Sequence, residues 1–323
     1  MVSESMGERR ADERPAAGAP SMAVDLGGVR MANPICTAAG TFGYAAQVEG
    51  FFDVARLGAV TCKGVAAEPW SGNPAPRLCE TCSGIINSVG LENPGVRAFV
   101  DDYGEYLEGL ERRGCRVIVQ AAGHSPAELA ESVRLFDELA PWASAIEVNV
   151  SCPNLELGGR PLGGTPEDAA EVMRAVRPLT SKPLLVKMAP ANVAEVARAL
   201  EAEGADALSL INTIPAMSID VRTRRSRISR PTGGLSGPAI HAIAVRMVWE
   251  AASAVSIPIN GMGGVETVED AAEMILAGAT AVTVGTATLH DPLAAARIAD
   301  GLPAWVASQG ATDVNDLIGA FEC

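Results

Sequence analysis

The chain has 323 residues, 48% of them hydrophobic, which is enough to bury the core of one large domain. Its formal net charge is −14, which argues against binding to the phosphate backbone of nucleic acid. Any anionic ligand would need local positive groups. No uninterrupted apolar run has the length that spans a bilayer, so we expect no membrane segment.

The first twenty residues are charged and small, and they lack the apolar segment of a secretory signal. We interpret residues 1–21 as a disordered extension and residues 22–323 as one domain. The seven cysteines are an odd number and widely spread, which fits a reducing cytoplasmic compartment. Cys79 and Cys82 have C-x-x-C spacing, but no second pair follows and the three histidines are scattered. We therefore interpret this spacing as a coincidence in a loop and expect no metal site.

From residue 33 onward, short apolar stretches alternate with segments of helical periodicity, and Val24–Met31 before them is expected to form a small hairpin. The predicted strands are Pro34–Ala38, Ala59–Lys63, Arg116–Ala121, Ala145–Val150, Leu184–Met188, Ala207–Ile211, Ile257–Asn260 and Ala281–Val284. The predicted helices are Pro126–Leu139, Pro166–Val176, Pro238–Ala254, Thr267–Ala277 and a helix that carries Val193, Val196, Ala197 and Leu200 on one face.

Eight strand–helix units in about 290 residues predict an α/β fold, a single (β/α)8 TIM barrel whose bottom is closed by the hairpin. A doubly wound sheet is the alternative, but no G-x-G-x-x-G follows the first strand. Residues 64–93 and 212–238 are too long for ordinary connections and are rich in Pro, Gly and Asn. Loops of this length usually build or cover a site. The glycine-rich segment Pro153–Thr165 is expected to be a mobile lid.

The stretch Asn149-Val150-Ser151-Cys152-Pro153-Asn154 places a thiol between carboxamides where a buried strand ends, because Pro153 cannot continue the ladder. The carboxyl end of a barrel strand is where chemistry is placed. A cysteine there can remove a proton or attack a carbon, and the asparagines can hold a polar ring. A half-buried cysteine without a chemical role is the alternative for these six residues alone.

Two glycine segments predict a bound phosphate. Gly261-Met262-Gly263-Gly264 ends the seventh strand and Gly285-Thr286 ends the eighth. Glycines allow backbone N–H groups to approach an anion, and the loops after strands 7 and 8 form the usual phosphate site of these barrels.

Lysine is scarce, and its positions are informative. The chain has only Lys63, Lys182 and Lys187, and the first and third of these end predicted strands. A buried ammonium group needs an anion or carbonyl dipoles beside it. Asn87, Asn149 and Asn212 also fall at loop or strand-end positions, and Thr213 follows the last of them. Carboxamides both donate and accept, which suits a ligand with alternating C=O and N–H groups.

Together these residues resemble the dihydroorotate dehydrogenases, FMN-dependent enzymes of pyrimidine biosynthesis, and the similarity runs from Met22 to Ile318. The segments that carry it are Gly72-Asn73-Pro74-x-Pro76-Arg77, Asn87-Ser88-Val89-Gly90-Leu91-x-Asn93-Pro94-Gly95, Asn149 to Asn154, Ile211-Asn212-Thr213, Gly233-Gly234-Leu235-Ser236-Gly237-Pro238 and Gly261-Met262-Gly263-Gly264. A cysteine at the base position resembles the soluble class 1 enzymes. Gly158-Gly159 and Met217-x-Ile219-Asp220 are most similar to the NAD-dependent type 1B, whose catalytic subunit pairs with a subunit carrying FAD and a [2Fe–2S] cluster.

The resemblance implies oxidation of (S)-dihydroorotate to orotate, with Cys152 taking a proton from C5 while C6 gives hydride to N5 of FMN. It assigns substrate binding to Lys63, Asn87, Ser88, Val89, Gly90, Leu91, Asn149, Asn212 and Thr213. It assigns cofactor binding to Ala39, Gly40, Lys63, Gly64, Gln120, Asn149, Lys187, Ile211, Gly237, Gly263, Gly264, Gly285 and Thr286. It also implies a cytoplasmic homodimer within a heterotetramer that passes electrons to NAD+.

Two positions depart from the family, which often has serine at the position of Ala39 and asparagine at that of Gln120. Four other functions stay open at this point. The first two are a fumarate-dependent soluble dihydroorotate dehydrogenase and a dihydropyrimidine dehydrogenase-like flavoenzyme. The others are a Schiff-base aldolase that uses Lys187 and a flavin-binding subunit without catalysis.

Overall fold

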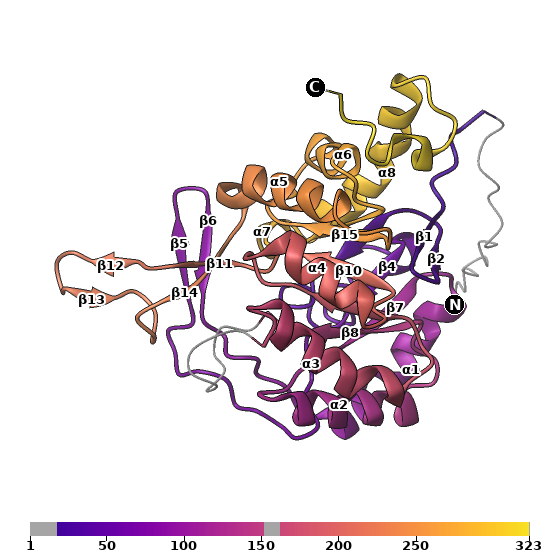
Figure 1. Ribbon diagram of the computed structural model, residues 1–323. Helices are drawn as coiled ribbons and strands as arrows, with labels where there is room; N and C mark the ends of the chain where they lie inside the picture. The colour runs from indigo at the N-terminus through magenta and orange to yellow at the C-terminus, as the bar shows by residue number, and fades with distance from the viewer. Residues whose placement is uncertain (1–17, 152–161, 323) are drawn as a thin grey trace, which may run out of the picture.

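Eight parallel strands close into a barrel at the centre of the computed structural model, which describes residues 18–151 and 162–322 (Figure 1). Around the barrel run β3 (Ile35–Thr37), β4 (Ala59–Thr61), β7 (Arg116–Ala121), β8 (Ala145–Asn149), β9 (Leu184–Lys187), β10 (Ala207–Leu210), β15 (Ile259–Met262) and β16 (Ala281–Val284), and β16 pairs with β3. The closed order confirms the predicted barrel and excludes the doubly wound alternative. Nearly every strand residue is buried, which is typical of parallel strands covered on both faces.

The predicted strand ends were wrong by one or two residues in several places. The clearest case is β15, predicted as Ile257–Asn260, which continues through Gly261 because that residue pairs with Leu210 of β10. Glycine lowers the local preference for a strand, and only the pairing with the neighbouring strand reveals that the ladder continues.

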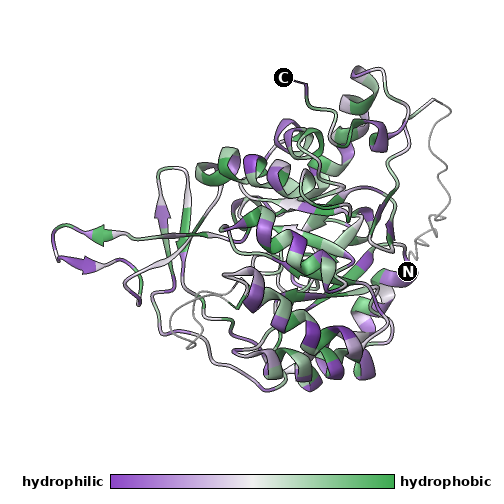
Figure 2. Cartoon of the chain, viewed as in Figure 1, coloured by the Kyte–Doolittle hydropathy of each residue, from purple (hydrophilic) through white to green (hydrophobic). Residues whose placement is uncertain are grey.

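The outer helices are α1 (Val96–Arg112), α2 (Pro126–Leu139), α3 (Pro166–Val176), α4 (Val193–Ala202), α5 (His241–Ala252), α6 (Val268–Leu276), α7 (Ala287–His290) and α8 (Ala294–Ser308). Ser125, Thr165 and Thr267 cap α2, α3 and α6 by accepting a backbone N–H, as expected for N-cap residues. In Figure 2 hydrophilic and hydrophobic residues alternate along these helices, whereas the strands of the barrel are mostly hydrophobic. No helix in the described residues combines the length and hydrophobicity needed to cross a membrane.

The first strand–helix unit differs from the other seven. Residues 38–58 contain a single 3-10 turn, η1 (Val54–Arg56), where an α-helix was expected. Phe42, Tyr44 and Phe52 are buried there, and the ring of Tyr44 packs 5.0 Å from that of Phe99 in α1. The predicted helix Pro238–Ala254 likewise begins as a 3-10 turn, η3 (Pro238–Ile240), before α5.

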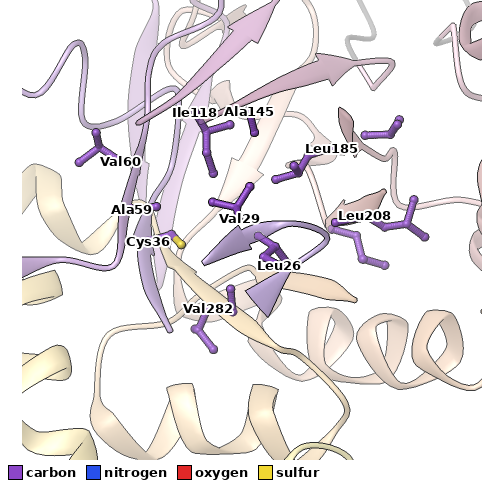
Figure 3. Packing of buried hydrophobic residues seen from close by; sticks show 14 of the residues in the cluster. Leu26, Val29, Cys36, Ala59, Val60, Ile118, Ala145, Leu185, Leu208 and Val282 are labelled. Atoms are coloured by element: carbon purple, nitrogen blue, oxygen red, sulfur yellow. The ribbon is translucent and has the colours of Figure 1, made fainter. Parts of the chain in front are cut away.

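An antiparallel hairpin closes the bottom of the barrel, as predicted. It consists of β1 (Val24–Leu26) and β2 (Val29–Met31). Leu26 and Val29 are buried among side chains from the starts of the barrel strands, including Cys36 and Leu185 (Figure 3). Before the hairpin, the Ser21 N–H donates to the carbonyl of Thr312. Ser21, which was expected to belong to the disordered extension, is therefore already bound to the folded domain.

A second sheet lies at the other end of the barrel, where the sequence predicted irregular loops (Figure 1). Residues 64–93 contain β5 (Leu78–Thr81) and β6 (Gly84–Asn87), and residues 212–238 contain β11 (Ile214–Ala216) and β14 (Gly233–Ser236). They form an antiparallel sheet in the order β11-β14-β6-β5, while β12 (Ile219–Asp220) and β13 (Arg225–Ser226) form a separate two-stranded ribbon that projects from the body. The C-x-x-C spacing therefore spans β5 and the turn after it.

Candidate active site

A cavity of about 330 Å³ lies where the carboxyl ends of the barrel strands meet the antiparallel sheet. This volume is within the range of small-molecule pockets, about 300–1,000 Å³. The residues assigned from the sequence that line it are Ala39, Gly40, Lys63, Gly64, Asn87, Ser88, Val89, Gly90, Leu91, Gln120, Asn149, Lys187, Ile211, Asn212, Thr213, Gly263, Gly264, Gly285 and Thr286. Segments up to about 250 positions apart in the chain thus meet at one site.

Two of the assigned residues are not in the described wall of the cavity. Gly237 supports the wall from behind, since its carbonyl oxygen lies 2.8 Å from the place a Cβ on Gly264 would occupy. Cys152 lies outside the described residues, as does the expected lid segment up to residue 161. The residue before it, Ser151, is buried.

The cavity is electropositive in an otherwise acidic protein. Lys63 and Lys187 line it, and no aspartate or glutamate does so among the described residues. Burial lowers the pKa of Lys63, an effect that the carboxylate of Glu92 opposes and the guanidinium of Arg77 reinforces. Lys187 is only 8% exposed and pairs in register with Asn149 on the neighbouring strand. Two of the chain's three lysines thus face one cavity, which suits an anionic ligand.

Four backbone N–H groups on one side of the cavity have no acceptor among the described residues. They belong to Gly263, Gly264, Gly285 and Thr286, at the ends of β15 and β16. The Thr286 hydroxyl donates to Ser236 Oγ at 2.8 Å, which joins this region to the antiparallel sheet. Clustered, unpaired N–H groups are the usual means of binding a phosphate in this fold.

A chain of hydrogen bonds fixes the amide side chains at the centre of the site. Gln120 Nε2 donates to the buried carboxylate of Glu147 at 2.5 Å, and Gln120 Oε1 accepts from Asn149 Nδ2 at 3.3 Å. Asn149 Oδ1 then accepts from the Ser151 hydroxyl, whose oxygen accepts from Asn212 Nδ2 at 2.5 Å. Because a carboxylate only accepts, Glu147 sets the orientation of the first amide and, through it, of the next two.

The loop Asn87–Leu91 is held from behind by the buried side chain of Asn73. Its Nδ2 donates to Ser88 Oγ at 2.9 Å, and its backbone N–H donates to the carbonyl of Val89. Arg230 in turn donates to Asn73 Oδ1 at 2.9 Å. The two sequence motifs 72–77 and 87–95 are therefore parts of one structural unit, because Asn73 of the first holds the loop of the second in place.

Several wall residues were not assigned from the sequence. Ile85, Pro215, Gly233 and Gly234 line the cavity from the antiparallel sheet. A Cβ on Gly234 would lie 1.9 Å from Thr213 Oγ1, so only glycine lets β14 pack against that side chain. The segment 233–238 was recognised as a motif, but its contribution to the wall depends on strand pairing across the chain.

The described cysteines do not supply a reactive thiol at the cavity. Cys36, Cys62, Cys79, Cys82 and Cys115 are described, and none of them lines it. Burial raises the pKa of Cys36 to about 12, and it raises the pKa values of Cys62 and Cys115 as well. These three side chains therefore remain thiols at neutral pH.

Comparison with known proteins gives one consistent result. Residues 21–306 match the family model described as dihydroorotate dehydrogenase. The chain is 46% identical over 306 residues to a protein of Geotalea uraniireducens and 44% identical over 305 residues to proteins of Trichlorobacter lovleyi and Geobacter sulfurreducens. Each alignment covers 94% of this chain and 99% of the relative, and each relative is named dihydroorotate dehydrogenase B (NAD(+)), catalytic subunit.

Proposed function

This chain belongs to the dihydroorotate dehydrogenase family, and on that premise we propose that it oxidises (S)-dihydroorotate to orotate with FMN as its resident cofactor. The single observation that carries the proposal is the cavity itself. It combines two lysines, a fixed set of amides and four unpaired N–H groups, with no carboxylate in its described wall. This set matches a pyrimidine carboxylate and a flavin phosphate.

The glycine-rich ends of β15 and β16 fit the phosphate group of FMN. The N–H groups of Gly263, Gly264, Gly285 and Thr286 would hold the phosphate, which would supply an acceptor to donors that have none within residues 18–151 and 162–322. Lys187 would place its positive charge beside the isoalloxazine ring, and Ala39, Gly40, Gly64, Gln120 and Ile211 would border that ring. When bound, FMN supplies the hydride acceptor that the side chains of the protein lack.

The substrate would lie above the ring, held by Lys63 and the amides. Lys63 offers a cation to the carboxylate of dihydroorotate, and Asn149 and Asn212 offer donors and acceptors to the ring amides. Their orientations are already fixed by Gln120 and Ser151, so little reorganisation would accompany binding. The loop 87–91, anchored by Asn73, would complete the enclosure.

Cys152 is the proposed base. None of the five described cysteines lines the cavity, while Cys152 follows directly after Ser151, whose hydroxyl joins Asn149 to Asn212. A thiol has an ordinary pKa of about 8.5, so it can accept a proton from C5 near neutral pH with little tuning.

We further propose a cytoplasmic homodimer that binds a second subunit carrying FAD and a [2Fe–2S] cluster and passes electrons to NAD+. The support is the printed name of the relatives, in which the catalytic subunit is one part of an NAD(+) enzyme. Copurification from the native source, followed by absorbance spectra and turnover with NAD+ or fumarate, tests this. Turnover with fumarate but not NAD+ would contradict it.

The central experiment is anaerobic stopped-flow mixing of the FMN-loaded protein with dihydroorotate. We expect the flavin absorbance to bleach with dihydroorotate and not with dihydrouracil, which lacks the carboxylate that Lys63 would hold. Cys152→Ser should keep its FMN but bleach roughly 10²- to 10⁴-fold more slowly, the usual contribution of a general base. Cys82→Ser is the matched control, because Cys82 is exposed and away from the cavity. Bleaching of Cys152→Ser at the wild-type rate would exclude that residue as the base.

A further inference from the structure

We propose that His241 is a positioning residue for the FMN phosphate: held by Glu273, its ring fixes the Gly263–Gly264 peptide so that the Gly264 N–H faces the cavity. The proposal rests on the proposed function only in that it takes FMN to be the ligand. No sequence motif indicates a function for this histidine.

The imidazole of His241 has polar contacts on both ring nitrogens. His241 is the first residue of α5, and its side chain is only 12% exposed. Its Nδ1 lies 2.9 Å from the carbonyl oxygen of Gly263, and its Nε2 lies 2.9 Å from Glu273 Oε2 and 3.7 Å from Asp270 Oδ1. All three partners offer oxygen atoms that accept, so the ring itself must donate through an N–H, and the two 2.9 Å contacts hold the imidazole between Gly263 and Glu273.

The same three side chains could in principle ligate a cation, since their ligand atoms lie within 4.8 Å of one another. The separation of 2.9 Å between Nε2 and the carboxylate oxygen is, however, a direct hydrogen-bond distance. The contact is therefore a direct hydrogen bond between the ring and Glu273, which holds the ring in place.

Fixing the carbonyl of Gly263 fixes the next N–H. In a trans peptide the C=O and the following N–H point in opposite directions. Gly263 and Gly264 line the cavity, whereas His241 does not. With the carbonyl oxygen turned toward His241, the Gly264 N–H is directed to the other side of the peptide plane, toward the cavity, where it has no acceptor among the described residues.

The packing around the loop requires glycine at position 264. Gly264 has φ +70°, and a Cβ there would lie 2.8 Å from both His241 Cβ and the carbonyl oxygen of Gly237. Beyond the glycines, the other carboxylate oxygen of Asp270 accepts the N–H groups of Glu266 and Thr267 at 2.9 Å each. Helix α6 thus anchors both ends of the loop that follows β15. Asp270 binds the end of the loop next to α6 directly, and Glu273 holds the glycine end through His241.

The test compares two flavins that differ only in the phosphate. Apoprotein of each variant is titrated with FMN and with riboflavin, and quenching of flavin fluorescence gives the two dissociation constants. His241→Leu removes both ring contacts and should weaken FMN binding about tenfold or more while changing riboflavin binding less than about twofold. His241→Asn keeps a donor near the position of Nδ1 and should fall between the two proteins.

His124→Leu is the matched control. His124 also lies next to a glutamate, with Nδ1 3.2 Å from Glu128 Oε2, but it does not line the cavity or contact the glycine loop. It should bind both flavins like the wild type. Since riboflavin has no phosphate, its unchanged binding to His241→Leu also shows that the variant is folded.

Each outcome has a distinct meaning. Failure of the wild-type protein to bind FMN overturns the proposed function. Normal FMN binding by the wild type, combined with equal weakening of both flavins or of neither in His241→Leu, overturns the role of His241. Loss of FMN affinity on treatment of the wild type with a metal chelator also overturns it, because the trio would then be a cation site.

Discussion

Burial and a bound anionic ligand have opposite effects on the pKa of Lys63. Loss of hydration lowers the pKa of its ammonium group, with Arg77 nearby adding to that effect. A bound carboxylate favours the charged form, and by linkage the charged form binds the carboxylate more tightly. The affinity for orotate should therefore report the protonation of this one residue.

We expect the dissociation constant of orotate to rise with pH as Lys63 loses its proton, beginning at a lower pH than for an ordinary lysine. Lys63→Arg stays charged throughout and should remove this alkaline rise, whereas Lys63→Ala should weaken binding roughly 10- to 100-fold at neutral pH. Perturbation of the flavin spectrum by orotate measures each constant. An identical alkaline rise in wild type and Lys63→Arg would assign it to another group.

Gln120 is a departure from the family that the structure explains. Its side chain reaches both Glu147 Oε1 at 2.5 Å and Asn149 Nδ2 at 3.3 Å, and the second oxygen of Glu147 is buried without a partner among the described residues. Asparagine is shorter by one methylene group and cannot bridge the same two partners. A buried carboxylate that loses its donor is strongly unfavourable.

Gln120→Asn, although it restores the residue common in the family, should therefore lower the free energy of unfolding by about 1–3 kcal/mol. Urea denaturation of the apoprotein measures this. Gln309→Asn makes the same chemical change at an exposed position, where the side chain donates to Ser308 Oγ at 3.2 Å, and should have almost no effect. An unchanged or higher midpoint for Gln120→Asn would show that the shorter amide finds other partners.

At the scale of elements, the β1–β2 hairpin covers the bottom of the barrel and buries the side chains there. Leu26 is fully buried there beside side chains from several barrel strands (Figure 3). Leu26→Ala should cost about 2–5 kcal/mol of unfolding free energy, the usual range for a buried leucine whose site cannot collapse. Arg30→Ala is the control on the same hairpin, because the Arg30 side chain is 90% exposed. Equal denaturation midpoints for the two variants would mean that the hairpin is dispensable for stability.

The elements also show what the sequence could and could not reveal. The barrel strands were predictable because each is a short, mostly apolar run, a signal contained within a few residues. The sheet β11-β14-β6-β5 was not, because its short, glycine-containing strands find partners about 150 residues away: Leu235 pairs with Ile86. Residues 38–58 were expected to include a helix, and only the packing of Phe42, Tyr44 and Phe52 explains its absence. The role of Cys152 stays a prediction.

At the scale of the whole molecule, the site is assembled from both ends of the chain. Gly40 comes from the first barrel unit and Thr286 from the last, and Asn87 and Gly234 come from the sheet that covers the barrel mouth. A ligand in this cavity therefore contacts segments that all belong to the closed barrel and its covering sheet. These segments can be separated from one another only when the barrel itself opens. Binding energy at the cavity should stabilise the complete fold and not a single loop.

FMN should consequently raise the thermal midpoint of the apoprotein, and riboflavin should raise it less. At a free FMN concentration of 100 times its dissociation constant, mass action adds about 2.7 kcal/mol, which for a domain of this size corresponds to roughly 4 °C. Differential scanning fluorimetry with an extrinsic dye, at matched flavin concentrations, gives the shift. In the proposed complex the N–H groups at the ends of β15 and β16 contact only the phosphate. The difference between the midpoint shifts with FMN and with riboflavin therefore measures how much these strand ends contribute to flavin binding. Equal shifts with FMN and riboflavin would place the phosphate outside the glycine loops, even if the protein binds the ring.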